Sequence, residues 1–460
     1  MINNREKVAA DFREEIKHAF EPEAKVLSAD RELRYCLELQ RARLAKRNLN
    51  CTDEMIHRGP FPNGLNRVRS WKDGHYDTSW TVDFITHNKT MQREGMKTFK
   101  QNETQSIYET VVDVHDGDDV SSDTYCCPNC GSVSTIAELQ EGCAYCGTSF
   151  KMSELYPKVK NYFFVFDMSG KTDHMFKTVI RYGLYLLPLN IIMCLAVLLQ
   201  KSGVGFKGLM AGEKVFTGLW SILYAPICIA LMIPVFGFVG WMLDCFRLAF
   251  SSLPVLFEVM GSRQRFAVGI SPVCPEFTFE YFISKIVSFF KIFAYSENRR
   301  DLPFYAGSDN GEEFDDLVDA SFFGTMSCKR VARKDNMVYV TGDLYMENAY
   351  DLSNRIKAKK EIFRVRAGRR TDIPFTTNFS ITKIQCPSCG GSFNAFKTRS
   401  CPYCGNEYKQ ENTDWVIYDI QNITKKIKIK RVITWLVVVA VFVGTFLYEM
   451  SMFYGLNNGF

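Results

Sequence analysis

The chain has 460 residues, enough for two or three domains with hydrophobic cores of their own. It carries 56 Lys and Arg against 51 Asp and Glu, and this net charge of +5 excludes a protein that binds nucleic acid over its whole surface. The first twenty residues are charged and lack the apolar stretch of a secretory signal peptide, so we expect no cleaved leader.

The cysteines are the clearest chemical signal in the chain. Eight of the 16 form four Cys-x-x-Cys pairs, and the others are scattered. This distribution indicates metal binding in a reducing compartment rather than a disulfide framework. Four of the paired cysteines lie in residues 127–147 and four in residues 386–405, so the sequence predicts two separate four-cysteine sites.

In chain order, we expect a helical segment over residues 1–50 and a strand-rich domain over 51–178 that contains the first cysteine site. Strand-like sequence precedes that site at 79–86 and follows it at 161–167. Two apolar segments and an interfacial helix are expected over 179–260. A second domain with the second site covers 275–420, and a basic flank with a third apolar segment covers 425–460.

Both cysteine sites have the spacing of zinc ribbons. Each second cysteine of a pair is followed by glycine, which suits the tight turn in which backbone N–H groups reach sulfur. Four thiolates fill a tetrahedral shell, so we expect two structural zinc ions rather than catalytic or rubredoxin-type iron centres. Redox dithiols are the alternative, and Cys126 is either a spare ligand or a bystander. The predicted ligands are Cys127, Cys130, Cys143 and Cys146, and Cys386, Cys389, Cys401 and Cys404.

Three uncharged apolar segments predict transmembrane helices. Residues 182–200 form a 19-residue stretch, which at about 1.5 Å per residue matches a hydrocarbon core of about 30 Å. Residues 216–243 form a longer stretch with two prolines, and residues 432–448 form the third. A buried helix of a soluble protein is the alternative for each. The sequence of 244–261 fits a helix at the membrane interface or one packed on the next domain.

The flanking charges predict the orientation in the membrane. The sequence before the third segment, 425–431, is strongly basic, and no basic residue follows that segment, so residue 425 is expected in the cytoplasm. An even number of spans separates the two large polar regions, so both are expected in the cytoplasm. We therefore predict a multi-pass protein of the cell membrane of a bacterium, with its C-terminal tail outside the cell.

The region 275–420 shows the patterns of a mixed α and β domain. Phenylalanines recur at helical spacing from residue 279 to 293 and predict one helix. We expect a second helix over 312–327, a strand over 336–351, and a further strand within 355–370. The order of strand, cysteine site and returning strand occurs in both halves and predicts a degenerate internal repeat.

The motifs "AYSENRRDLPFY", "VYVTGDLYM", "KKEIFRVRAG" and "DWVIYDI" together resemble the C-terminal domain of mitochondrial inner-membrane translocase subunit 44 and its bacterial relatives. The resemblance covers 275–420, about a third of the chain. It implies an α+β fold, an antiparallel sheet curved around helices into a cone similar to the nuclear-transport-factor-2-like fold. It also implies membrane association and protein binding rather than catalysis. The mitochondrial protein is peripheral, whereas this chain has predicted spans of its own.

Basic residues form a candidate surface for anionic lipid headgroups or a protein partner. Residues 355–370 hold eight Lys or Arg and one acid, and alternation places Lys360, Arg364 and Arg366 on one face of the strand. A solvated strand face with ordinary topology-setting charges is the alternative. The candidate residues are Lys360, Arg364, Arg366, Arg369, Arg370, Lys425, Lys426, Lys428, Lys430 and Arg431.

No sequence motif indicates an active site. The six histidines are dispersed, and the chain has no phosphate-binding glycine loop, HExxH helix or GxSxG turn. We therefore predict a non-enzymatic membrane scaffold or tether for a protein partner, in envelope or protein-transport processes. A sensor or carrier for a small or lipid ligand is the first alternative, and recruitment of RNA or another anionic polymer by the basic strand is the second.

Overall fold

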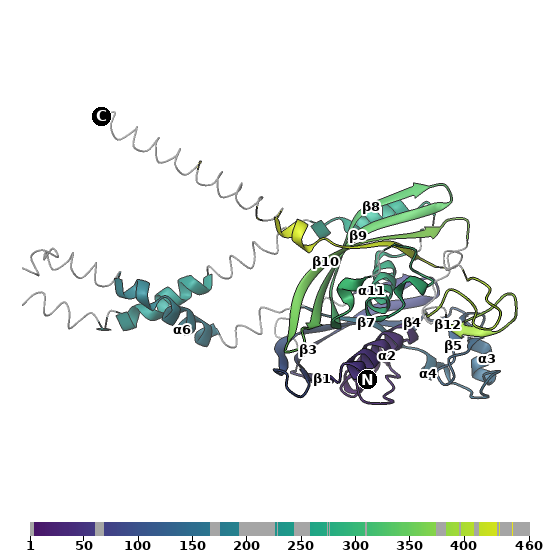
Figure 1. Cartoon of the computed structure of the whole chain (residues 1–460), viewed down its shortest axis with the longest axis horizontal. Helices are drawn as coiled ribbons and strands as arrows, with labels where there is room; N and C mark the ends of the chain where they lie inside the picture. The colour runs from purple at the N-terminus through teal and green to yellow at the C-terminus, as the bar shows by residue number, and fades with distance from the viewer. Residues whose placement is uncertain are drawn as a thin grey trace, which may run out of the picture. The chain divides into compact units, whose positions relative to one another are not determined.

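The computed structural model describes two compact units, Met1–Phe166 with Val259–Phe460, and Asp167–Glu258 (Figure 1). We call the first unit the body and treat the second by itself. The residues described are 4–59, 69–165, 175–192, 226–227, 229–242, 258–273, 275, 277–308, 311–373, 383–394, 397–408, 414–429, 432 and 444. They confirm the α+β class, with antiparallel sheets and two four-cysteine clusters.

The N-terminal half of the body is a helix pair followed by an antiparallel sheet. The helices are α1 (Asn4–Ile16) and α2 (Arg31–Lys46), and the sheet order is β1-β3-β4-β7, with β2 paired to β3. The first ribbon lies between β4 and β7. The strands are β1 (Asn50–His57), β2 (Ser70–Asp73), β3 (Tyr76–Gln92), β4 (Phe99–Val114) and β7 (Lys158–Val165), and the ribbon region holds β5 (Thr124–Cys126), β6 (Val133–Thr135), α3 (Ile136–Glu141) and α4 (Met152–Leu155).

The C-terminal half repeats this order of elements. The helices α10 (Ser262–Ile270) and α11 (Phe279–Tyr295) precede an antiparallel sheet of order β13-β10-β9-β8, and the second ribbon lies between β10 and β13. The predicted repeat of strand, ribbon and returning strand is thus confirmed. The remaining elements are η1 (Arg299–Asp301), η2 (Glu312–Phe314), β8 (Leu317–Lys334), β9 (Met337–Asp351), β10 (Ile356–Arg370), β11 (Lys383–Gln385), β12 (Ser392–Asn394) and β13 (Val416–Asn422).

The prediction of a second helix in this half, over 312–327, is wrong. Only η2 is helical there, and β8 begins at Leu317. The alternation that marks a strand is interrupted, because the pairing of β8 with β9 shifts register between Phe322 and Met326. Gly324, inside this bulge, has φ +70°, a conformation that glycine adopts without steric cost.

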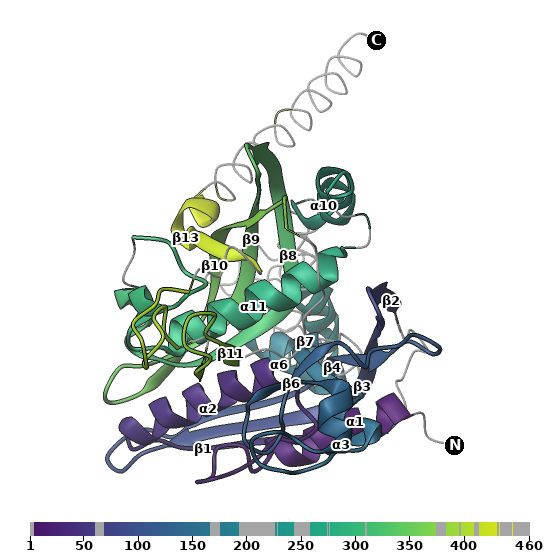
Figure 2. The ribbon, with the colours of Figure 1, turned by 90° about the vertical axis from the view of Figure 1, so that its right-hand side faces the viewer.

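The two halves share one hydrophobic core rather than stacking as separate domains. The core joins Tyr35 of α2 and Phe163 of β7 to the phenylalanines of α11 and the buried Trp415. In Figure 2, α2 and α11 lie side by side. The ring of Phe163 packs edge-on to Phe322 of β8, with ring centroids 5.8 Å apart. Each half therefore depends on the other to cover its apolar surface.

A buried charge cluster also joins the halves. Glu32, in the first turn of α2, is fully buried, and its two carboxylate oxygens each lie 2.5 Å from a lysine nitrogen, one from Lys160 of β7 and one from Lys285 of α11. Lys160 also pairs with Asp30, and Lys285 with Asp414, at 2.7 and 3.1 Å. Burial opposes the charge on Lys285, but Asp414 and Glu32 outweigh it and hold its pKa well above the usual value.

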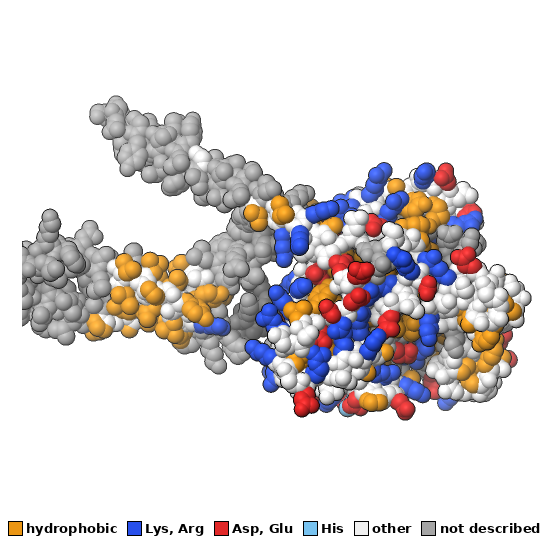
Figure 3. Space-filling view, viewed as in Figure 1, with side chains coloured by type: hydrophobic (Ala, Val, Ile, Leu, Met, Phe, Trp, Pro, Cys, Tyr) orange, Lys and Arg blue, Asp and Glu red, His pale blue; other side chains and the backbone are white. Residues whose placement is uncertain are grey.

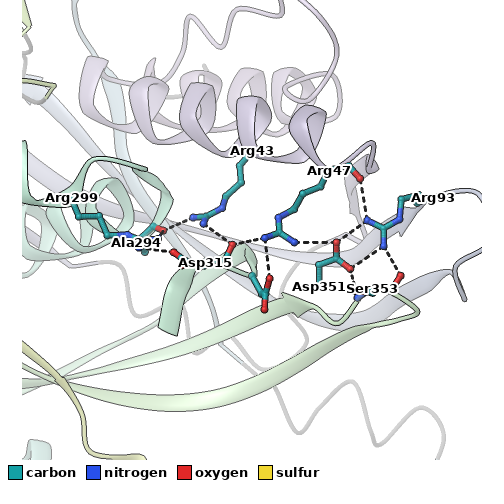
Figure 4. Close-up of polar contacts among 9 residues, drawn as sticks. Arg43, Arg47, Arg93, Ala294, Arg299, Asp315, Asp351 and Ser353 are labelled. Atoms are coloured by element: carbon teal, nitrogen blue, oxygen red, sulfur yellow. Dashed lines mark hydrogen bonds and ion pairs between the residues drawn. The ribbon is translucent and has the colours of Figure 1, made fainter. Parts of the chain in front are cut away.

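A second set of polar contacts links the halves near the ends of β3 and β9 (Figure 4). The Arg93 guanidinium binds the Asp351 carboxylate at 2.8 and 3.2 Å, and Arg47 reaches the same carboxylate at 3.3 Å. Arg43 donates to the carbonyl oxygen of Asp315 at 2.8 Å and to that of Ala294, near the C-terminus of α11. Arg43 thus binds the Ala294 carbonyl, which the end of α11 leaves without an intrahelical donor.

The second unit is described in part, as helical residues 175–192, which include α6 (Met175–Tyr185), and 229–242. The contact between them uses glycine: a Cβ on Gly237 would lie 2.0 Å from the Val179 carbonyl oxygen, and one on Gly183 2.3 Å from that of Ile233. Asn190 donates across the contact to the Ile229 carbonyl at 3.0 Å. Apart from Arg181, the exposed side chains of these described helices are apolar, among them Leu184, Ile192, Leu231, Val235 and Phe238.

Among the residues that the structure describes, no helix combines the length and the apolar character needed to cross a membrane. The predicted spans 182–200, 216–243 and 432–448 and the predicted interfacial helix 244–261 lie wholly or partly outside those residues.

Gly324 offers a test of the joint between the halves. A Cβ added there would lie 2.2 Å from the Phe163 ring, which is itself held by Trp80, Tyr108 and Phe322. Gly95 has a similar φ of +74°, but a Cβ added there would have no atom within 4 Å. Gly95→Ala therefore loses stability only through the strained backbone conformation. We expect Gly324→Ala to lose about 1–3 kcal/mol more stability than Gly95→Ala in thermal unfolding. Equal losses would contradict this packing.

Candidate metal centres

The structure brings each predicted set of four cysteines together. In both clusters the four sulfurs lie within 4.8 Å of one another. The Sγ atoms of Cys127 and Cys146 are 3.7 Å apart, as are those of Cys130 and Cys143. In the second cluster, the Cys386–Cys404 and Cys389–Cys401 distances are both 3.6 Å. These separations exclude disulfides and match the spacing of about 3.8 Å that a tetrahedral ion with metal–sulfur bonds of about 2.3 Å requires.

Four equivalent turns position the sulfurs. In each, the glycine after the second cysteine donates its N–H to the carbonyl of the first, at 2.8, 2.7, 2.9 and 2.8 Å in chain order. The φ angles of these glycines lie between +70° and +73°. A side chain would be strained in this left-handed conformation, so the sequence repeats glycine at all four places. The glycines are Gly131, Gly147, Gly390 and Gly405.

Local hydrogen bonds favour the thiolate form that a metal needs. Bonds with the side chain and backbone of Thr148 lower the pKa of Cys146 to about 6. Backbone bonds from Cys389 and Ser388 lower the pKa of Cys386 to about 6. In the same clusters, burial raises the pKa of Cys127 to about 12, and the pKa of Cys404 is also raised to about 12, so the pKa values of about 6 belong to one sulfur of each cluster. Cys126 lies in β5, fully buried and outside the four-sulfur group.

The two ribbons, far apart in the sequence, lie against each other at one end of the body, where β6 of the first contacts β11 of the second (Figure 1). Arg399 fastens the second ribbon to the C-terminal half by donating to the backbone carbonyls of Leu302 and Tyr305. Each ribbon exposes a tyrosine immediately before its last cysteine. Tyr145 is 58% exposed and Tyr403 71% exposed.

The predicted basic strand has the expected alternation, with Phe363 and Val365 buried. Several of its cations have partners in the body: Arg364 pairs with Asp343 at 2.8 Å, and Arg366 lies 4.7 Å from the Tyr339 ring centroid. Arg369 was expected at the surface and is only 1% exposed, so it cannot serve as a surface contact.

The remaining candidates divide between the surface and the part of the chain outside the described residues. Lys360 lies 5.0 Å from the Phe323 ring centroid, and Arg370 pairs with Asp372 at 2.6 Å. Residues 424–429 are helical, with Lys425, Lys426 and Lys428 exposed. Lys430 and Arg431 lie outside the described residues.

Sequence reasoning missed three features. The paired exposed tyrosines carried a signal, because "AYCG" and "PYCG" occur at the same place in the two ribbons. The buried lysines of α11 also carried one, because Lys285 and Lys291 interrupt an apolar helix. The carboxylate partner of Lys285 carried no such signal in the sequence, because Glu32 and Lys285 are 253 residues apart.

Comparison with known proteins gives no relative for this chain. No protein-family model, no curated protein and no solved structure matches it.

The clusters predict the metal content of the purified protein. We expect two ions per chain, one ion in Cys143→Ser or Cys401→Ser, and none when both substitutions are combined, because each cluster needs all four thiolates to close its shell. Metal analysis by mass spectrometry measures this directly. Cys51→Ser is the matched control, because Cys51 lies outside both clusters. A single-cluster variant that keeps two ions would contradict the assignment.

Proposed function

We propose that this chain is a membrane-anchored, non-enzymatic scaffold that presents two zinc ribbons as one docking platform for a protein partner. The observation that carries the proposal is the meeting of the ribbons at one end of a single body, each with an exposed tyrosine at the same position. Tyrosine is enriched in protein interfaces because it combines apolar area with a hydrogen-bonding group. Since four sulfurs already fill each shell, the proposed zinc ions have a structural role.

The membrane anchor is supported by the second unit. Its helices pack through glycines and an asparagine and carry apolar side chains on the outside, which is the arrangement expected of helices surrounded by lipid. We propose that 182–200, 216–243 and 432–448 span the cell membrane, with the body in the cytoplasm and the C-terminal tail outside.

The resemblance to the C-terminal domain of translocase subunit 44 remains part of the proposal. The C-terminal half has two helices beside a four-stranded antiparallel sheet, which is compatible with the implied cone-like plan. The likeness favours envelope or protein-transport work and binding of a protein. In this half, the rings of Phe290, Phe314 and Phe363 pack together between helix and sheet.

A small-ligand sensor or carrier is the second candidate. A cavity of about 940 Å³ lies between α1 and the neighbouring strands β1 to β3. Polar side chains, among them Arg5, Arg13, His57 and Asp83, line it beside Trp80. This cavity suits a polar ligand better than the apolar or lipid ligand suggested by the sequence.

Photo-crosslinking tests the scaffold. A photoreactive amino acid in place of Tyr145 or Tyr403, in native membranes, should capture the same protein from both positions, because both lie on one platform. The same residue in place of Lys17, which is exposed but outside the ribbons, should not capture it. If neither ribbon position yields a recurrent partner, the docking function is wrong. Release of the protein from membranes by alkaline carbonate would separately refute the anchor.

A further inference from the structure

The end of the body opposite the ribbons is built from two β-hairpin tips, one from each half. Residues 93–98 connect β3 to β4, and residues 352–355 connect β9 to β10. We propose that these tips, together with the helix at 424–429, form a surface that binds anionic lipid headgroups and holds the zinc ribbons away from the membrane. The inference rests on the proposed membrane anchoring and adds the surface and its ligand class.

Strand direction places the membrane at this end. In the N-terminal half, β7 runs antiparallel to β4, and its last residue, Val165, pairs with Ser106, toward the β3–β4 tip. In the C-terminal half, Asn422 at the end of β13 pairs with Phe363, toward the β9–β10 tip. The chain therefore leaves both sheets about halfway along β4 and β10 and runs toward the tip end, and in both cases a predicted span follows.

The ribbons occupy the opposite end of the same strands. β4 alone has 16 residues, and at about 3.4 Å per residue its path from the tip to the ribbon end is about 50 Å. The order of elements in both halves thus separates the metal clusters from the points at which the chain enters the proposed membrane.

The two tips form one surface because they are bonded to each other. The Lys97 N–H donates to the Asn354 carbonyl at 3.3 Å, and Lys97 and Arg355 form a parallel β-bridge. Arg93 of one tip binds Asp351 and the Ser353 carbonyl of the other (Figure 4). A flat ligand such as a bilayer surface can contact both tips at once.

The charge of this surface is strongly positive. Residues 93–100 and 351–360 contain seven Lys or Arg and two acids, a net charge of +5 that equals the net charge of the whole chain. Asp351 is already bound to arginine, which leaves Glu94 as the exposed acid. Lys and Arg side chains gather on the side of the body where β3 and β10 meet (Figure 3). The exposed basic residues are Lys97, Lys100, Arg355, Lys357, Lys359 and Lys360.

The helix at 424–429 extends the surface toward the third predicted span. Thr424 accepts a hydrogen bond from the Ile362 N–H at 2.9 Å, so the helix begins beside the basic part of β10. Its three lysines are exposed, and so are Ile429 and Val432 at the start of the apolar segment. Lysines followed by exposed apolar residues are typical of chain that enters the headgroup layer.

The two ribbons together carry little net charge. The first ribbon, 127–147, has two acids and no Lys or Arg, whereas the second, 386–405, has Lys397 and Arg399 and no acid, and its Arg399 is bound to backbone carbonyls. A negative leaflet therefore attracts the tips, with their net charge of +5, more strongly than the ribbons, and each Lys or Arg near such a surface contributes about 1 kcal/mol. The same field would orient the tyrosine pair toward the cytoplasm.

Lysine acetylation of the full chain in lipid nanodiscs tests this orientation. We expect the labelling rates of Lys97, Lys100, Lys357 and Lys359 to fall on the order of fivefold when phosphatidylserine replaces part of the phosphatidylcholine, as about 1 kcal/mol per lysine implies. Lys151, exposed at the ribbon end, should label equally in both discs. Lys97→Glu with Lys359→Glu should abolish the lipid dependence at Lys100 and Lys357, whereas Lys151→Glu should preserve it.

The outcomes separate the two proposals. A protein that enters nanodiscs but labels at the same rate with either lipid would overturn the headgroup surface and leave the anchor intact. Protection of the tip lysines by added RNA in phosphatidylcholine discs, without an effect of phosphatidylserine, would also overturn it in favour of polymer binding. Failure to insert into any disc would refute the anchor itself.

Discussion

The buried carboxylate of Glu32 is the contact on which the body depends. It binds one lysine from each half, Lys160 of β7 and Lys285 of α11, and water does not reach it. Charges buried this deeply are tolerated only when they are paired, and removing one partner typically costs about 3–5 kcal/mol. Burial, with a smaller contribution from the charge of Glu32, raises the pKa of neighbouring Asp30 to about 6 despite the opposing effect of Lys160. The halves therefore have to be positioned together.

Once the halves are joined, the ends of the body follow from strand direction. Each half places its ribbon between the third and fourth strands of its β1-β3-β4-β7 or β8-β9-β10-β13 order, so the metal clusters meet at one end. The hairpin tips meet at the other end, through Lys97 and Arg355. A repeat that would be two small sheets with little core of their own becomes one body with a docking end and a basic end.

Local patterns in the sequence predicted the elements that local chemistry controls. The cysteine spacing and the glycines of the turns predicted both clusters, and the periodicity of α11, β9 and β10 predicted their types. The prediction of a helix over 312–327 was wrong because the bulge at Gly324 breaks the alternation of β8. This bulge packs against Phe163 of the other half. The burial of Arg369 and the pairing of Glu32 with Lys285 depend on residues far along the chain, and no local pattern encodes them.

Hydrogen exchange of two α11 variants tests the joint most directly. Lys285→Met removes a partner of Glu32. Lys291→Met removes another buried lysine of α11, whose pKa is lowered by burial and whose Nζ lies 5.3 Å from the Tyr162 ring centroid. The account predicts that Lys285→Met lowers amide protection in α2 and β7 of the N-terminal half together with α11 and β8, and that Lys291→Met has little effect. Loss of protection confined to α11, or equal effects of both variants, would contradict it.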